Sequence, residues 1–149
     1  MTDIGFMAAA LAEAECAAGV GEVPIGAVVV DAGGRILAAG HNRVILDRDP
    51  TAHAEMLVLR VAARELGSER LAACDLYVTL EPCPMCAQAI SFARIRRLYY
   101  GASDPKGGGV ESGPRLYTLP TSLHRPEVYG GIAASRAGAL LRDFFQARR

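Results

Sequence analysis

The sequence is poor in cysteine and lysine, and it contains no long uninterrupted apolar run. Four cysteines in 149 residues do not make the disulfide framework that is typical of small secreted domains. The first residues, Met-Thr-Asp-Ile-Gly, lack the basic and apolar regions of a signal peptide. No apolar run reaches the length of a membrane span. We therefore expect a cytoplasmic protein that does not contact a membrane.

The rest of the composition is that of an ordinary globular protein. Hydrophobic residues make up 51% of the chain and charged residues 21%, which is close to the usual balance. A chain of this length can bury a substantial core. We expect a single domain over residues 1–149.

Acidic and basic residues are unevenly distributed along the chain, although the net charge is zero. Residues 1–93 hold six arginines and twelve acidic residues, whereas residues 94–149 hold nine arginines, the single lysine and four acidic residues. Such an asymmetry can indicate a nucleic-acid-binding face. The basic residues can equally be scattered over a solvated surface, so charge alone leaves both interpretations open.

Two short segments carry the residues most suited to chemistry. Residues 51–55 read Thr-Ala-His-Ala-Glu, and residues 81–86 read Glu-Pro-Cys-Pro-Met-Cys. One imidazole and two thiols, from His53, Cys83 and Cys86, make a three-ligand zinc site. A zinc ion with three protein ligands keeps a position for water, and that water ionises near neutral pH to become a hydroxide nucleophile.

Two other interpretations of these cysteines remain open. A Cys-x-x-Cys pair in a cytosolic protein can be a redox pair, and a closed structural zinc site would need a fourth ligand. The other Cys and His residues that could supply it are Cys16, Cys74, His41 and His124. Both of these cysteines fall in helix-like segments, so we interpret them as small core residues. The open, catalytic zinc site is favoured.

The pattern of apolar residues predicts an α/β protein. Helices are expected at residues 3–18, 51–63, 84–90 and 133–147, the second with Thr51 as its N-cap and the third beginning at Pro84. Strands are expected at 23–30, 35–39, 76–80 and 96–100, with a brief strand at 115–118 as a further candidate. The first two strands would form a hairpin, and a right-handed crossover would join the next two in parallel. The order gives a three-layer α/β/α fold with a central mixed sheet.

The expected helices bring the motif residues to helix starts. His53 would lie in the first turn of one helix, and Cys83 and Cys86 would flank the N-terminus of the next. The partial positive charge at a helix N-terminus stabilises thiolates. Residues two apart on a helix diverge by about 200°, so Glu55 should not bind the metal beside His53.

The combined motif resembles the signature of zinc-dependent nucleobase deaminases. Further stretches resemble the bacterial tRNA-specific adenosine deaminases, within the cytidine deaminase superfamily. They are Glu-Val-Pro-Ile-Gly-Ala-Val at 22–28, Gly-His-Asn at 40–42, and the segments 94–101, 104–113 and 140–145. The resemblance implies a cytidine-deaminase-like fold, one Zn²⁺ per chain, a homodimer, and conversion of adenosine to inosine at the wobble position of a tRNA anticodon.

The resemblance also implies roles for individual residues. His53, Cys83 and Cys86 become zinc ligands, and Glu55 becomes the general acid/base that moves protons between water, ring nitrogen and leaving ammonia. We interpret Glu81, which precedes the proline of the second motif, as structural.

The substrate contacts that the resemblance implies are less specific. Asn42 would hydrogen-bond the target base, but it can also be a turn-capping residue. The Ala54 N–H would contact the reacting group. Asp104 would accept a hydrogen bond from a ribose hydroxyl, or would serve only as a turn residue before proline. The candidate phosphate contacts are Lys106, Arg148 and Arg149, each of which can also be merely solvated.

Two rival functions remain. A deaminase of a free base or nucleotide, such as guanine, cytosine or deoxycytidylate, would share the zinc motifs but would not need a basic C-terminal region. A structural zinc protein that binds RNA would not need Glu55. Gln146 stands where many members of the resembling family have an arginine, so the phosphate contact of that arginine is not expected here. We expect Val23 and Ile25 to line the base pocket.

Overall fold

The computed structural model describes residues 2–149 of the chain. Helices and strands alternate through most of this range. In chain order they are α1 (Asp3–Gly19), β1 (Gly26–Val30), β2 (Ile36–His41), α2 (Ala54–Leu66), β3 (Asp75–Leu80), α3 (Pro84–Phe92), β4 (Arg97–Ala102), the 3₁₀ helix η1 (Leu116–Thr118), β5 (Glu127–Tyr129) and α4 (Ala134–Gln146).

The strands form one mixed sheet in the order β2-β1-β3-β4-β5. Strand β1 pairs antiparallel with both β2 and β3, as the predicted hairpin requires. Strands β3, β4 and β5 run parallel to one another. All five residues of β1 are buried, and so are the first five of β3, because helices cover both faces of these inner strands.

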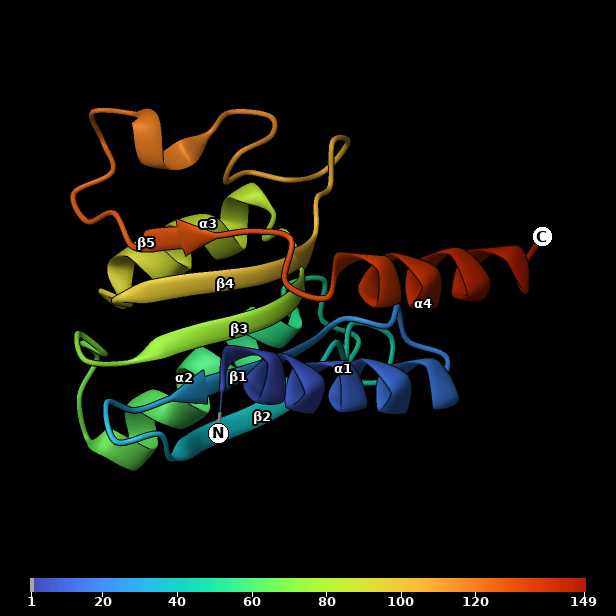
Figure 1. Cartoon of the computed structure of the whole chain (residues 1–149), viewed down its shortest axis with the longest axis horizontal. Coiled ribbons are helices and arrows are strands. Elements are labelled where there is room, and N and C mark those ends of the chain that lie inside the picture. The colour runs from blue at the N-terminus through green and yellow to red at the C-terminus, as the bar shows by residue number, and fades with distance from the viewer. Residues whose placement is uncertain (1) are drawn as a thin grey trace.

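The sheet lies between two pairs of helices. In Figure 1, α1 and α4 lie in front of the sheet, and α2 and α3 lie behind it. Each face of the sheet has its own apolar cluster. On the side of α1 and α4, the cluster includes Phe6, Met7 and Leu11 of α1. On the other side, it includes Val58 of α2 and Ile90 of α3. The expected three-layer α/β/α fold with a central mixed sheet is therefore confirmed.

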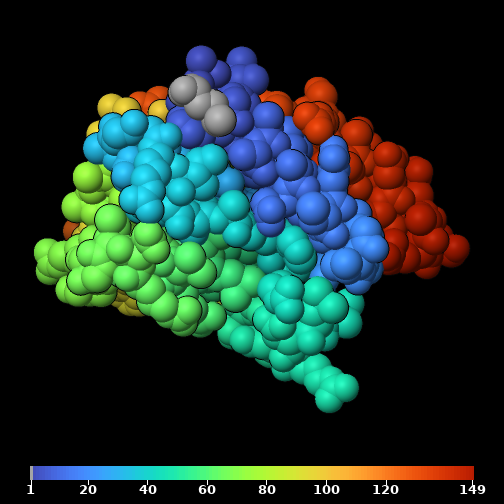
Figure 2. Space-filling view, turned by 90° about the horizontal axis from the view of Figure 1, so that it is seen from below, coloured from blue at the N-terminus to red at the C-terminus, as the bar shows by residue number. Residues whose placement is uncertain are grey.

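Helices α1 and α4 lie side by side although they come from opposite ends of the chain. Figure 2 shows the blue N-terminal helix next to the red C-terminal one. Arg136 of α4 and Glu15 of α1 form an ion pair of 2.8 Å between them. Within residues 2–149, the helices are too short or too polar to cross a bilayer.

The brief strand proposed at 115–118 is wrong. Residues Leu116–Thr118 form the 3₁₀ helix η1, closed by a hydrogen bond of 2.9 Å from the Thr118 N–H to the Arg115 carbonyl. Arg115 has a φ of 47°, a left-handed conformation that ends any extended strand. Tyr117 is buried and donates its hydroxyl to the Ala87 carbonyl at 2.8 Å, so this segment packs on α3 and does not join the sheet.

One strand of the sheet, β5, was not predicted from the sequence. It has only three residues, Glu127–Tyr129, and pairs with β4 through Arg97 and its two successors. Three residues are too few to show an alternation of apolar and polar side chains. Tyr129 joins a row of stacked rings with Tyr99 and Tyr77 across the sheet, and this long-range contact stabilises the strand.

Candidate active site

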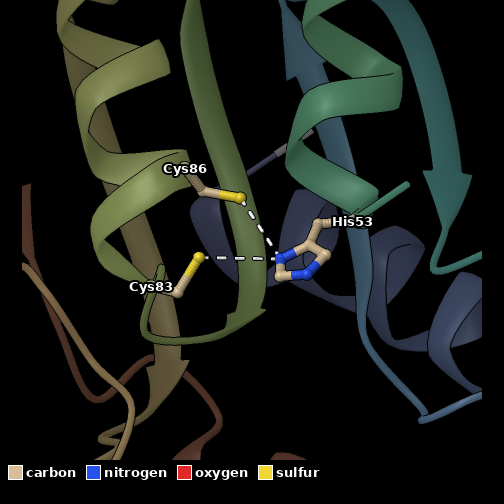
Figure 3. A group of neighbouring side chains, drawn as sticks. All are labelled: His53, Cys83 and Cys86. Atoms are coloured by element: carbon tan, nitrogen blue, oxygen red, sulfur yellow. Dashed lines mark hydrogen bonds between the residues drawn. The ribbon is translucent and has the colours of Figure 1, made fainter. Parts of the chain in front are cut away.

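The three predicted zinc ligands meet at one end of the sheet, where strands lead into helices. Figure 3 shows the His53 ring facing the sulfur atoms of Cys83 and Cys86. The His53 Nδ1 atom lies 3.6 Å from the Cys83 Sγ and 3.5 Å from the Cys86 Sγ. All three ligand atoms lie within 4.8 Å of one another.

These distances fit a tetrahedral zinc ion. Zinc–nitrogen bonds of ~2.0–2.1 Å and zinc–sulfur bonds of ~2.3 Å at the tetrahedral angle separate the two donors by about 3.6 Å, which matches the values for His53. In the part of the chain that the structure describes, this group holds no fourth His, Cys, Asp or Glu. The donor set therefore suits a zinc ion that keeps a position for water.

Local contacts explain why His53 is placed just before α2. We expected Thr51 to be the N-cap and His53 to lie in the first turn, but the structure makes His53 the N-cap, in an extended conformation with φ −73° and ψ 149°. Thr51 instead donates its hydroxyl to Asp49 at 2.7 Å. The side chain of Asn42 takes over part of the capping, because its Oδ1 accepts the Ala54 N–H at 2.8 Å. That contact comes from another element and has no local signal in the sequence.

The second pair of ligands sits at the start of α3, as expected. Cys83 is the N-cap, Pro84 is in the first turn, and Cys86 follows in the same turn. The pKa of Cys83 is lowered to about 4, first by the hydrogen bond with Cys86 and also by His53, against the opposing effect of burial. The contact with Cys83 and burial raise the pKa of Cys86. The lowered pKa favours the thiolate form of Cys83, and the partial positive charge at the N-terminus of α3 favours the same form.

Glu55 lies in the first turn of α2 and lines the same small pocket as His53 and Cys83. Its side chain is buried, and burial is the main reason that its pKa is raised to about 7. A carboxyl group with such a pKa can both take and release a proton near neutral pH. Glu55 is not in the ligand group, which agrees with the expectation that it faces water and substrate instead of the metal.

The pocket has a volume of about 170 Å³. Its lining comes from the residue before β1, from the start of α2, from the end of β3, from the start of α3 and from the loop after β4. The residues are Ile25, His53, Glu55, Leu80, Glu81, Cys83, Asp104 and Gly107. Ile25 was expected here, and Val23 lines a neighbouring hollow of about 540 Å³. Leu80 and Gly107 were missed, although Leu80 directly precedes the second motif and could have been inferred from it.

Asn42 and Ala54 are hydrogen-bonded to each other in this structure. Asn42 is buried, and its Oδ1 accepts the Ala54 N–H, so the N–H assigned to the reacting group already has a partner. Within residues 2–149, the one hydrogen bond of the Asn42 side chain is this one through Oδ1. Asn42 thus caps the start of α2 with its oxygen and not the turn after β2, and its contact with a target base stays a prediction.

Asp104 also has two functions available to it. It lines the pocket, and its Oδ1 accepts the Gly107 N–H at 3.0 Å and the Lys106 N–H at 3.3 Å. One oxygen therefore organises the turn, as the simpler interpretation required. The other oxygen, Oδ2, forms no hydrogen bond with the described residues and is available to a ligand.

None of the three basic candidates lines this pocket. Lys106 lines the neighbouring hollow. Arg148 stacks on the Phe144 ring, with its guanidinium carbon 3.5 Å from the ring centre. Arg149 is exposed at the end of the chain. Of these three cations, only Lys106 borders the neighbouring hollow, and a contact of any of them with phosphate stays a prediction.

The alternative ligands are used elsewhere. His41 contacts the Asn42 carbonyl at 2.8 Å, and His124 contacts the Ile95 carbonyl at 2.6 Å. Cys74 is buried, as expected for a small core residue, but Cys16 is exposed, so that interpretation of Cys16 was wrong. None of the four joins His53, Cys83 and Cys86, which disfavours a closed structural site.

Comparisons with known proteins agree with this geometry. Residues 1–102 match the family model of the cytidine and deoxycytidylate deaminase zinc-binding region. A tRNA-specific adenosine deaminase of Agrobacterium fabrum is 58% identical over 144 residues, which cover 97% of this chain and 94% of that protein.

Two solved structures show the same fold. One comes from a study of A-to-I editing by tRNA:A34 deaminases at the wobble position of transfer RNA. It has 58% identity and a TM-score of 0.90, and the match covers 92% of this chain and 99% of that chain. A guanine deaminase from Nitrosomonas europaea has 26% identity and a TM-score of 0.84, with 96% and 84% covered. The chain therefore belongs to the cytidine and deoxycytidylate deaminase family, and by its identity over nearly its whole length to the tRNA-specific adenosine deaminases within it.

Proposed function

We propose that the protein is a zinc-dependent hydrolase that converts adenosine to inosine at the wobble position of a tRNA anticodon. The observation that carries the chemistry is the presence of Glu55 in one small pocket with a His-Cys-Cys group of zinc-compatible spacing. The identity with tRNA-specific adenosine deaminases over nearly the full chain supports the substrate class.

The proposed reaction needs metal ligands and a group that transfers protons. His53, Cys83 and Cys86 hold one zinc ion per chain, which when bound lowers the pKa of a water molecule so that it can attack C6 of adenine. A Glu55 carboxylate oxygen takes the proton of that water and delivers it to N1 of the ring. The same carboxylate then takes the proton of the hydroxyl group now on C6 and passes it to the amino nitrogen, so that the C6–N bond breaks, ammonia leaves and a C6 carbonyl remains. The raised pKa of Glu55 suits both transfers.

Asn42 and Asp104 position the nucleoside. The free Nδ2 of Asn42 donates a hydrogen bond to an acceptor on the purine edge. The free Oδ2 of Asp104 accepts a hydrogen bond from a ribose hydroxyl, which distinguishes RNA from DNA. The Ala54 N–H assists by holding Asn42 in place.

A second hollow supports a polymeric substrate over a free base. The pocket of about 170 Å³ is suited to one base, whereas the adjoining hollow of about 540 Å³ shares Leu80, Asp104 and Gly107 with it. Lys106 and Phe145 also line that hollow, and these are a cation for phosphate and an aromatic ring for stacking. Arg148 and Arg149, at the end of α4, are further candidates for phosphate contacts. A single-stranded loop can place its flipped base in the small pocket and a neighbour in the larger hollow.

The decisive experiment is incubation of the zinc-loaded protein with total tRNA, followed by inosine mapping. We expect inosine at position 34 of an anticodon, and no deamination of free guanine, cytosine or deoxycytidylate. Turnover of guanine without any inosine in tRNA would assign the protein to the activity of its 26% identical neighbour instead.

The proposed assembly is a homodimer. An apolar hollow of about 330 Å³ lies between α2 and α3, and Phe92 in its lining is 69% exposed. Large exposed apolar groups of this kind often mark protein interfaces. Sedimentation should give a dimer for the unmodified chain and a monomer for Phe92→Asp; a monomer in both cases would remove the dimer from the proposal.

A further inference from the structure

Glu81 has an unusual number of partners for one side chain. It is 2% exposed, and its carboxylate accepts five hydrogen bonds from the loop that follows β4. The donors to Oε1 are the Asp104 N–H at 3.0 Å and the Ser112 hydroxyl at 2.8 Å, and the donors to Oε2 are the N–H groups of Val110 at 3.2 Å, Glu111 at 2.9 Å and Ser112 at 2.9 Å. Each donor lies more than twenty residues away in sequence.

The loop is built to approach this carboxylate closely. A Cβ atom at Gly108 would lie 2.5 Å from the Glu81 Cδ, and one at Gly109 would lie 2.7 Å from the Pro84 backbone. Only glycine permits such distances, so the loop backbone can surround the carboxylate and offer it several N–H groups. The Gly109 N–H also donates to the Pro82 carbonyl at 2.8 Å.

The position of Glu81 connects this loop to the metal-binding motif. Glu81 stands between the last residue of β3 and Cys83. The same loop carries Asp104 and Lys106, which line the pocket and its neighbouring hollow. One short segment of chain therefore holds a zinc ligand and, through one buried carboxylate, the wall that faces the substrate.

We infer that Glu81 is a positioning residue: its carboxylate fixes the loop 103–113 against the start of α3, and thereby sets where Asp104 and Lys106 meet the RNA. This inference rests on the proposed function for its RNA part, whereas the fixing of the loop does not. Glu81 belongs to the pocket lining, but both of its carboxylate oxygens accept hydrogen bonds from the loop, so we assign it an action through the loop. Loss of its bonds should weaken RNA binding while the metal site stays intact.

The sharpest variant is Glu81→Gln, which keeps the shape but replaces one acceptor oxygen by an NH₂ group that faces backbone donors. If the NH₂ group takes the Oε1 position, the Ser112 hydroxyl can rotate and accept a hydrogen bond from it. The Asp104 N–H can only donate, so its hydrogen bond is lost. The matched control is Asp75→Asn. Asp75 is a buried carboxylate at the opposite end of β3, where it pairs with Arg96 at 2.9 and 3.0 Å.

The first measurement is amide hydrogen exchange by mass spectrometry on the zinc-loaded proteins. Peptides that cover 103–113 should exchange at least ~10-fold faster in Glu81→Gln, since each tenfold corresponds to about 1.4 kcal/mol and a bond to a charged group is worth at least that much. Asp75→Asn should leave these peptides unchanged, and zinc content should be equal in all three proteins. Unchanged exchange of 103–113 in Glu81→Gln would overturn the inference, whatever the substrate is.

The second measurement is a double-mutant cycle on binding of an anticodon stem-loop. We expect Lys106→Ala to weaken binding in the unmodified protein and to have little further effect in Glu81→Gln, because the loop already misplaces this lysine. The salt dependence should fall by about 0.7 in logarithmic slope for each phosphate contact that is lost. Fully additive effects would overturn the inference. Absence of stem-loop binding by the unmodified protein would instead contradict the proposed function and leave the exchange result to decide the role of Glu81.

A milder variant covers the case in which Glu81→Gln fails to fold. Ser112→Ala removes only the hydroxyl bond to Oε1. It should speed the exchange of 103–113 by a smaller factor and should leave zinc binding unchanged. Equal exchange in Ser112→Ala and in the unmodified protein would then count against the inference.

Discussion

Replacing Glu55 by glutamine should remove a pH-dependent loss of stability from the metal-free protein. Burial raises the pKa of Glu55 from 4.5 to about 7 in the folded state. The folded protein therefore binds this proton more tightly than the unfolded chain does. Its stabilising contribution is complete below pH 4.5 and is lost as the pH rises through 7. At about 1.36 kcal/mol for each pKa unit, the loss is about 3 kcal/mol.

The assay is urea unfolding of chelator-treated protein at pH 5 and pH 8. Far-UV circular dichroism is the suitable probe, because the chain has no tryptophan. The free energy of unfolding of Glu55→Gln should gain about 2.5 kcal/mol on that of the unmodified protein between pH 5 and pH 8, because part of the loss has already occurred at pH 5. Glu65→Gln, which changes an exposed acid on the same helix outside the pocket, is the matched control variant. The same difference in stability at both pH values would refute the argument that burial controls the pKa of Glu55.

Three other perturbations have defined outcomes. Glu55→Ala should keep zinc and the fold but lose at least ~10²-fold in single-turnover deamination of a stem-loop, and near-normal turnover would exclude its proton transfer. Cys86→Ser should lower zinc affinity at least ~100-fold, the upper end of the loss on removing an outer partner of a ligand, as measured by competition with a chelator. Gly26→Ala should cost at least about 1–3 kcal/mol in urea unfolding, because its Cβ would lie 2.0 Å from a carbonyl oxygen of α1. Gly33→Ala, whose Cβ has no contact below 3.5 Å, is the matched control and should cost much less.

Much of the fold could be predicted because the spacing of apolar residues within short segments indicates the helices and strands. The helices α1 and α4 show apolar residues at helical spacing, and β3 is a run of apolar and β-branched residues between them. Pro84 marks the start of α3 by itself, since proline suits the first turn of a helix. The zinc ligands and Glu55 could be proposed for the same reason: their spacing within each motif is short enough to be seen without the fold.

The features that were missed or wrong depend on distant contacts. The start of α2 moves from Thr51 to His53 because Asn42, from the end of β2, caps it. Strand β5 is too short to show a pattern and is stabilised by pairing with β4. The five bonds of Glu81 join segments more than twenty residues apart, so a sequence can suggest only that this acid is structural. Cys16 looked like a core residue because its helix is rich in alanine, yet its own face is exposed.

The direction of β5 determines which part of the chain borders the substrate. Because β5 runs parallel to β4, the polypeptide leaves β4 at Ala102, beside the pocket, and must return to the far end of the sheet before it reaches Glu127. An antiparallel neighbour would need only a two-residue turn and would leave no backbone over the catalytic end. The 103–126 connection can therefore vary at exposed positions such as Leu123, while the contacts of Glu81 and Tyr117 keep it beside α3.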